Sequence, residues 1–354
     1  MNIETYMKLI GNTLKYQTSG YILQKIINDL RKSGVAKYNN DENGTKVKID
    51  SDWDKVTRVC QCLNEKPEST IQYIEKMLIT KGYRYSIYFR CSKFKIEDTY
   101  ENYNLYDDYL PIAIKNIDDF SRPILKIDKD RIIIKFEKSI DPYYPEINRT
   151  ENIIDSTLWI YHKNLEILEF RFNNIALKGN DDFYQTTLNA QLDILRKRHK
   201  LTVEEFRTSE IIEEIVTNKK KEVHLICQDL GLMKDSSAKL KVGNNMVMPF
   251  IGDLEEIIEN NSELLNSTKE AKKVSQLFID YVNNIKENAK YKTRLLSWYD
   301  SNGDSKLNIN VTFSYRDRSY DLYNFLEIKK IDMEMMNYAI EYIYQIFSDI
   351  RNNK

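Results

Sequence analysis

Three residues in the last part of the chain have the types that metal-dependent hydrolysis uses. Asp321 precedes Glu327 and Lys329, which lie on an expected strand, and Asp317 is a further carboxylate just before them. Two carboxylates can hold Mg²⁺, and a lysine beside them can activate water or stabilise the negative charge that develops. Asp321, Glu327 and Lys329 are therefore the candidate catalytic residues of this sequence.

Their spacing loosely resembles the carboxylate plus Glu-x-Lys pattern of metal-dependent nucleases of the PD-(D/E)xK type. Such a short pattern arises by chance in a chain with 53 Lys and Arg and 54 Asp and Glu residues. The loop before Glu327 is short, and few residues follow Lys329 to complete that fold. A nuclease is therefore an alternative hypothesis, and the sequence favours a protein that is not an enzyme.

Other catalytic and cofactor motifs are missing from the sequence. The ten glycines are widely spaced, so a glycine-rich phosphate loop and a Gly-x-Ser-x-Gly turn are excluded. His162, His199 and His224 are scattered, and the four cysteines lack zinc-ribbon spacing. We therefore expect no metal and no cofactor.

A basic helix and an expected hairpin near the start of the chain suggest a nucleic-acid contact. Lys25 and Arg31 lie on a helix after Ser19, and Lys46 and Lys48 lie beyond Asn43-Gly44, a strong hairpin signal. In a winged-helix arrangement the helix enters the major groove, and basic residues of the wing neutralise phosphates. The alternative is a small helical domain whose exposed residues are basic. Acidic residues at the hairpin tip would repel phosphate.

A second candidate for nucleic-acid contact is one face of the expected strand over residues 83–91. Arg84, Tyr88 and Arg90 alternate on that face. An aromatic ring between guanidinium groups can stack on a base while the arginines hold phosphates. The alternative is that Tyr88 packs beneath a helix and the arginines pair with acidic residues in 97–108.

The elements that must position these residues fall into three parts. Residues 1–80 carry apolar residues at helical spacing, with helices beginning after Ser19 and at Pro67. Beyond residue 80 the apolar period changes to two, which indicates strands. The expected strands are 83–91, 131–136, 156–162, 165–172, 222–227, 239–251, 294–300, 307–316 and 324–330. One helix is expected after Asn180, and a long helix with an apolar stripe after Ser267.

A closing helix from Asp332 is expected to cover the strands that precede it. The fold class is therefore α+β. A helical, winged-helix-like module (residues 1–80) precedes two antiparallel-sheet-plus-helix modules (81–202 and 203–354). Whether these two modules are repeats of one another stays open.

Composition narrows the function classes without naming one. The net charge is −1, so nucleic-acid binding would require a local basic patch. No apolar run approaches the length that spans a membrane, and the few cysteines are typical of reduced thiols in the cytoplasm. Abundant Lys, Asn, Ile and Tyr indicate an AT-rich bacterial or mobile-element genome.

We therefore expect a cytoplasmic, non-catalytic binding or adaptor subunit of a bacterial or mobile-element assembly, such as an antiviral defence system. It would contact DNA or RNA and other protein subunits, with no membrane partner. A scaffold that binds protein alone and the nuclease remain the alternatives.

Overall fold

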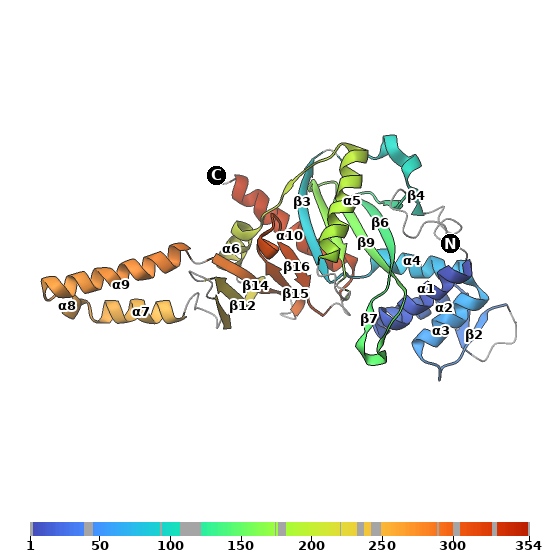
Figure 1. Cartoon of the computed structure of the whole chain (residues 1–354), viewed down its shortest axis with the longest axis horizontal. Helices are drawn as coiled ribbons and strands as arrows, with labels where there is room; N and C mark the ends of the chain where they lie inside the picture. The colour runs from blue at the N-terminus through green and yellow to red at the C-terminus, as the bar shows by residue number, and fades with distance from the viewer. Residues whose placement is uncertain are drawn as a thin grey trace. The chain divides into compact units, whose positions relative to one another are not determined.

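The computed structural model describes residues 3–38, 45–92, 94–106, 122–173, 175, 182–219, 221–231, 237–241, 249–288, 290–299, 305–327 and 331–352. The chain divides into two units, and Figure 1 labels their elements. Unit 1 comprises residues 1–206 and 327–348, and unit 2 comprises residues 207–326 and 349–354. The expected α+β class is confirmed, and the division into three modules stays a prediction.

Helices α1 to α4 and two short strands begin unit 1: α1 (Ile3–Tyr16), α2 (Gly20–Lys32), β1 (Ala36–Tyr38), β2 (Val47–Ile49), α3 (Lys55–Glu65) and α4 (Pro67–Thr80). The Ser19 side chain caps α2 by accepting a hydrogen bond from the backbone N–H of Ile22, as the sequence predicts. Pro67 opens α4, also as predicted. The buried faces of these helices form a core that also includes Ile124 and Ile154 from the sheet.

The expected hairpin between residues 35 and 49 is wrong. Strands β1 and β2 pair in parallel, with Ala36 opposite Val47 and Tyr38 opposite Ile49. A two-residue turn cannot join parallel strands, and Asn43-Gly44 lies outside the described residues. The error has a physical reason, because alternation of buried and exposed residues does not reveal the direction of pairing. The winged-helix detail is thus not confirmed.

The sheet of unit 1 follows the order β3-β10-β9-β6-β5-β4. Neighbouring strands are antiparallel except β4 and β5, and β11 also pairs with β3. The strands are β3 (Tyr85–Ser92), β4 (Asn104–Leu105), β5 (Ile124–Ile127), β6 (Arg131–Ile140), β9 (Ile153–His162), β10 (Ile167–Phe172) and β11 (Thr202–Glu205). The short pair β7 (Tyr143–Tyr144) and β8 (Arg149–Thr150) and the 3-10 turns η1 (Glu97–Asn102) and η4 (Pro145–Ile147) complete this part.

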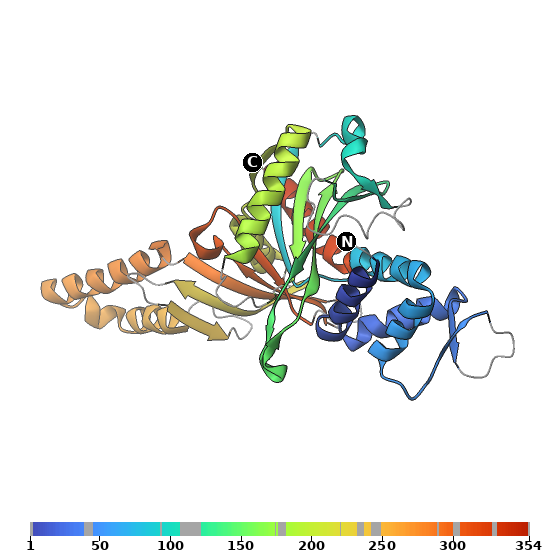
Figure 2. The same cartoon turned by 45° about the vertical axis from the view of Figure 1, so that its right-hand side comes forward.

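Two helices pack on the central strands of unit 1. Helix α5 (Phe183–His199) runs alongside the sheet in both views (Figures 1 and 2), and its Gln191 accepts a hydrogen bond from the indole of Trp159. Helix α10 (Met333–Asn352) contributes Asn337, which accepts a hydrogen bond from Arg171 of β10. All residues of β9 and β10 are buried, as in sheets that are covered on both faces.

Most of the closing helix belongs to unit 1. Residues up to Ser348 of α10 belong to unit 1, although β14, β15 and β16 belong to unit 2. The expectation that this helix covers the strands just before it stays a prediction. An apolar helix face shows that the helix packs on a sheet, but it does not show which sheet.

Unit 2 contains an antiparallel sheet of order β13-β12-β14-β15-β16. Its elements are α6 (Ser209–Asn218), β12 (Val223–Gly231), β13 (Ser237–Lys241), α7 (Pro249–Asn260), α8 (Ser262–Leu265), α9 (Lys269–Asn288), β14 (Lys290–Tyr299), β15 (Ser305–Thr312), η5 (Tyr315–Asp317) and β16 (Leu322–Phe325). The expected strand 239–251 is wrong at its end, because α7 begins at Pro249.

Candidate functional sites

The structure does not support the candidate nuclease residues as a metal site. Asp321 is buried, and its carboxylate accepts hydrogen bonds from the N–H and hydroxyl of Thr208 (2.7 and 2.8 Å) and from the N–H of Ser314 (2.9 Å). Strand β16 ends at Phe325, and Glu327 has a left-handed backbone with φ 55°, so the expected strand 324–330 is wrong from Leu326 to Glu327, and residues 328–330 lie outside the described residues. Lys329 lies outside the described residues. Asp321 therefore holds two loops together.

Tyr88 cannot stack on a base in this fold, because its side chain is only 1% exposed. Arg90 lies 3.6 Å from Glu204 of β11, so it pairs with an acidic residue outside the stretch 97–108. Arg84 is exposed at the start of the same face. The structure thus removes Tyr88 from the candidate nucleic-acid contacts and gives Arg90 a partner within the protein.

Basic residues do gather beside α2, although the hairpin is absent. The parallel register places Lys37 opposite Lys48, and Lys46 Nζ lies beside Gly34 at the end of α2. Burial lowers the pKa of Lys37, and the charges of Lys46 and Lys48 lower it further. Like charges so close together favour the binding of an anion between them. We call Lys37, Lys46 and Lys48 the basic cluster.

Tyr38 follows Lys37 on β1 and packs partly against the helical core, with two arginines near its ring. The guanidinium of Arg31 lies 4.2 Å from the centre of the Tyr38 ring, and that of Arg58 lies 5.8 Å from it. Lys25 is on the same helix as Arg31, nearly two turns earlier. Sequence reasoning found Arg31, Lys46 and Lys48 but missed Tyr38 and Arg58, because Arg58 approaches from α3.

A cavity of about 180 Å³ lies in unit 1 between the ends of α1 and α4 and strand β9. Its polar lining includes Lys81, Arg84, Asp155, Ser156 and Asn173. A smaller apolar cavity of about 30 Å³ shares Ile22, Leu78, Lys81 and Ile154 with it and extends between α1, α2 and α4 as far as Glu75. We call the two together the unit 1 cavity.

Burial raises the pKa of Glu75, at the apolar end of this cavity, to about 7, and two groups at the polar end also have shifted pKa values. Burial raises the pKa of Asp155 to about 7, although Lys81 and Lys138 oppose the shift. Burial lowers the pKa of Lys81 to about 8, and Asp155 opposes that shift. Among the described residues no hydrogen bond or ion pair is made by the carboxylate of Asp155, which is only 4% exposed. Perturbed groups in a cavity mark candidate functional sites.

The sequence does hold a signal for Asp155 that sequence reasoning missed. Asp155 is an acidic residue within the run of apolar and hydroxyl residues that forms β9. A charged residue in a strand that is buried on both faces needs a partner or a function. Lys81 gives no such signal, because lysines at helix ends are common.

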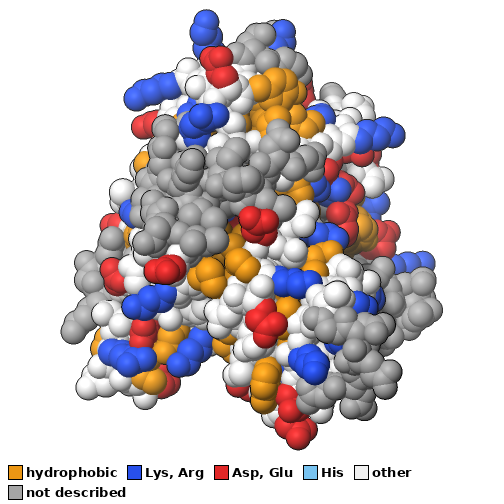
Figure 3. Space-filling model, turned by 90° about the vertical axis from the view of Figure 1, so that its right-hand side faces the viewer, with side chains coloured by type: hydrophobic (Ala, Val, Ile, Leu, Met, Phe, Trp, Pro, Cys, Tyr) orange, Lys and Arg blue, Asp and Glu red, His pale blue; other side chains and the backbone are white. Residues whose placement is uncertain are grey.

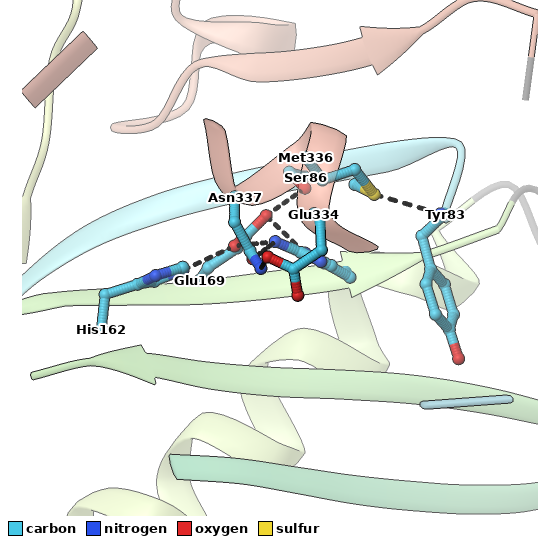
Figure 4. A network of polar contacts seen from close by, with 8 residues as sticks. Tyr83, Ser86, His162, Glu169, Glu334, Met336 and Asn337 are labelled. Atoms are coloured by element: carbon cyan, nitrogen blue, oxygen red, sulfur yellow. Dashed lines mark hydrogen bonds and ion pairs between the residues drawn. The ribbon is translucent and has the colours of Figure 1, made fainter. Parts of the chain in front are cut away.

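A buried polar network on the α10 side of the unit 1 sheet is, by contrast, well paired (Figure 4). Glu169 accepts two hydrogen bonds from Arg171 (both 2.7 Å), one from Ser86 (2.6 Å) and lies 2.9 Å from His162 Nε2. Arg171 also donates to Asn337. Burial favours the neutral acid, but these partners outweigh it and lower the pKa of Glu169 to about 2. His162 is thus part of a structural network.

Unit 2 exposes apolar side chains on a helical hairpin. Helices α7 and α9 lie side by side and are joined through α8; they extend away from strands β12 and β14 of the same unit (Figure 1). The exposed apolar residues are Ile257, Leu264, Val274, Leu277, Phe278, Ile279 and Tyr281, of which Leu264 and Leu277 are each 67% exposed. Val282, in contrast, is buried. We call α7, α8 and α9 the helical hairpin.

The spacing on α9 gives this exposed surface a regular form. Val274, Phe278 and Tyr281 recur at intervals of four and three residues, and Leu277 lies beside them. Such spacing forms one stripe along a helix, as in helices that pair with another helix. The apolar stripe predicted after Ser267 is thus present, and most of it faces away from the protein.

Charged side chains of opposite sign alternate on the face of the molecule that Figure 3 shows. Lys and Arg groups are interspersed there with Asp and Glu groups, and hydrophobic groups lie between them. That face has no continuous basic band among the residues described, so the electrostatic attraction for a polyanion is confined to local clusters.

Among the described helices, none has the length and apolar composition required to cross a membrane. Within the described ranges, His, Cys, Asp and Glu side chains do not form a group that could hold a metal ion. Comparison of the sequence with protein-family models gives no match, and comparison with curated proteins gives no similar sequence.

Proposed function

We propose that the chain is a non-catalytic binding subunit that assembles through its helical hairpin. The observation that carries this proposal is the exposed stripe of Val274, Leu277, Phe278 and Tyr281. Contiguous apolar residues that stay in water are costly, and on a helix they favour docking of another helix.

The partner that fits this surface is the hairpin of a second copy. Helix α7 carries Glu255, Glu256 and Glu259, whereas α9 begins with Lys269, Lys272 and Lys273. A two-fold axis brings the acidic helix of one copy against the basic helix start of the other. The hairpin is thus complementary to itself in charge as well as apolar in its stripe.

Sedimentation of the full chain tests this assembly. We expect a reversible dimer at concentrations up to about 100 μM. Leu277→Ala should weaken the dimer about tenfold or more, since burial of a leucine contributes about 1.5–3 kcal/mol. Asn283→Ala, on an exposed position of the same helix, is the matched control. A monomer over the whole concentration range, or a dimer that Leu277→Ala leaves unchanged, would contradict the proposal.

The basic cluster supports nucleic-acid contact as a second function. Lys37, Lys46 and Lys48 supply three ammonium groups for contacts with phosphates. Arg84, just before β3, is exposed and stays a candidate contact. Our proposal that the assembly belongs to a bacterial or mobile-element system, such as antiviral defence, rests on composition alone.

Fluorescence anisotropy with DNA and RNA duplexes at several salt concentrations tests the second function. The double variant Lys46→Ala/Lys48→Ala should weaken binding and reduce the salt slope by about 1.8, since each DNA phosphate that a lysine neutralises contributes about 0.9. Lys197→Ala, an exposed lysine of α5, is the control. Binding that is absent at low salt, or equal in both variants, refutes a nucleic-acid role for the cluster.

A further inference from the structure

The unit 1 cavity contains two opposite charges that the fold leaves unsatisfied. Asp155 is 4% exposed, and neither its carboxylate nor the ammonium of Lys81 makes a hydrogen bond or ion pair among the described residues. The lysine ammonium does lie 4.9 Å from the centre of the Tyr83 ring. Buried polar groups are nearly always paired, so the carboxylate of Asp155, with the half-buried Lys81 beside it, is arranged to meet something that enters the cavity.

The hydroxyl groups around Asp155 already make hydrogen bonds within the protein. Thr13 donates to the carbonyl of Leu9, and Thr18 donates to that of Thr13. Ser19 caps α2, and Ser156 donates to Glu137. These hydroxyls are therefore occupied within the protein, and recognition in the cavity falls to the charged groups.

The charges define the polar part of a ligand. Lys81 and Arg84 present two cationic groups, which suit a carboxylate, and Asp155 presents one carboxylate, which suits an ammonium. A molecule with only one of these groups would leave the opposite charge buried and unpaired. A zwitterion with adjacent ammonium and carboxylate groups satisfies both.

The shape defines the rest of the ligand. The apolar extension is lined by Ile10, Leu14, Ile22, Ile26, Ile74, Met77, Leu78 and Ile154. Its aliphatic walls suit a short branched hydrocarbon chain. The main cavity, of about 180 Å³, is smaller than the pockets of about 300 Å³ or more that hold drug-sized ligands.

We propose that the unit 1 cavity binds a small aliphatic α-amino acid. The carboxylate lies against Lys81 and Arg84, the ammonium lies against Asp155, and the side chain lies toward Ile22, Leu78 and Ile154 at the apolar extension. The site belongs to unit 1 and is independent of assembly through the helical hairpin.

Calorimetric titration of the full chain with L-leucine, L-isoleucine, L-valine and L-methionine tests the site. Two matched probes separate the polar groups: 4-methylpentanoate lacks the amine of leucine, and 3-methylbutylamine lacks its carboxylate. We expect at least one of the amino acids to bind, and both probes to bind at least tenfold more weakly than leucine. No heat and no change in melting temperature with any of the four at about 10 mM would overturn the proposal.

Variants connect the binding to the named residues. Asp155→Asn and Lys81→Met should each weaken amino-acid binding at least tenfold, whereas Asp193→Asn on the exposed face of α5 should leave it unchanged. Circular dichroism checks that each variant is folded. Because the two variants change opposite charges, one of them still tests the site if the other does not fold. Unchanged binding in both folded variants, or equal binding of 4-methylpentanoate and leucine, refutes the assignment.

Discussion

Replacement of Asp155 by asparagine should stabilise the protein, and increasingly so as pH rises. Burial raises the pKa of this carboxyl from 3.8 to about 7. A group whose pKa is raised in the folded state retains its proton there while the unfolded chain has lost it. Stability therefore falls as pH rises from about 4 to about 7, and the loss is complete above that range. Asparagine has almost the same shape and does not ionise, so it removes this loss.

The magnitude follows from the shift in pKa. The two pKa values of 3.8 and about 7 differ by about 3 units, or about 4 kcal/mol at 1.36 kcal/mol per unit. The advantage of Asp155→Asn over the natural chain is then about 2 kcal/mol near pH 5 and about 4 kcal/mol near pH 7.5. These values are upper bounds, because Lys81 loses a favourable neighbour in the variant. The experiment therefore tests how much the stability advantage of the variant grows between the two pH values, which we expect to be about 2 kcal/mol.

Urea unfolding at both pH values measures this difference. Trp53 and Trp159 both belong to unit 1, so the tryptophan fluorescence of a Trp298→Phe background follows that unit. Asp193→Asn is the control for loss of an exposed carboxylate. An Asp155→Asn variant with the same stability as the natural chain at both pH values, or with lower stability near pH 7.5, would refute the assignment of Asp155 as a buried, unpaired acid.

Further substitutions test the fold around the sites. Gly82→Ala should destabilise unit 1 by about 1–3 kcal/mol in urea unfolding, because a Cβ at Gly82 would lie 2.5 Å from the carbonyl oxygen of Ile331; Gly11→Ala, in open space on α1, should instead stabilise by about 0.5–1 kcal/mol. Glu169→Gln should cost about 3–5 kcal/mol at neutral pH, because it leaves a buried arginine without its anion. In the natural chain the lowered pKa of Glu169 contributes stability above about pH 4.5, and this is lost as pH falls toward about 2, which acid titration followed by circular dichroism checks. Asp321→Ala should lower the melting temperature without changing any Mg²⁺-dependent cleavage, and loss of such a cleavage would restore the nuclease hypothesis.

Local chemistry in the sequence predicted the local structure well. The cap at Ser19, the helix start at Pro67 and the change to strand periodicity after residue 80 all depend on neighbouring residues. The sequence did not predict which segments, far apart in the chain, pair or pack with each other. Strand β2 pairs in parallel with β1, and α10 packs on the sheet of unit 1. Apolar periodicity identifies a face to be buried but not the surface that buries it.

The candidate sites show the same limit. Arg31, Lys46 and Lys48 were found because basic residues stand out in sequence, and the structure does gather the lysines with Lys37. Tyr88 was misjudged, because alternation gives the face of a strand and not whether that face is covered. The proximity of Lys81 to Asp155 in one cavity could not be predicted, since helix α4 and strand β9 meet only in three dimensions.

Two buried acids of unit 1, Glu169 and Asp155, differ in how the fold pairs them, and this difference identifies the candidate site. The Glu169 carboxylate receives hydrogen bonds from every side, and its low pKa shows that the fold stabilises its charge. Asp155 is buried almost as deeply in the neighbouring strand, yet its pKa is raised and its carboxylate opens on a cavity beside Lys81. A chain that can pair one buried acid fully has no structural reason to leave the other unpaired, because an apolar or amide residue would stabilise the fold more. Destabilising groups persist where they perform a task, so the unit 1 cavity is a binding site rather than a packing defect.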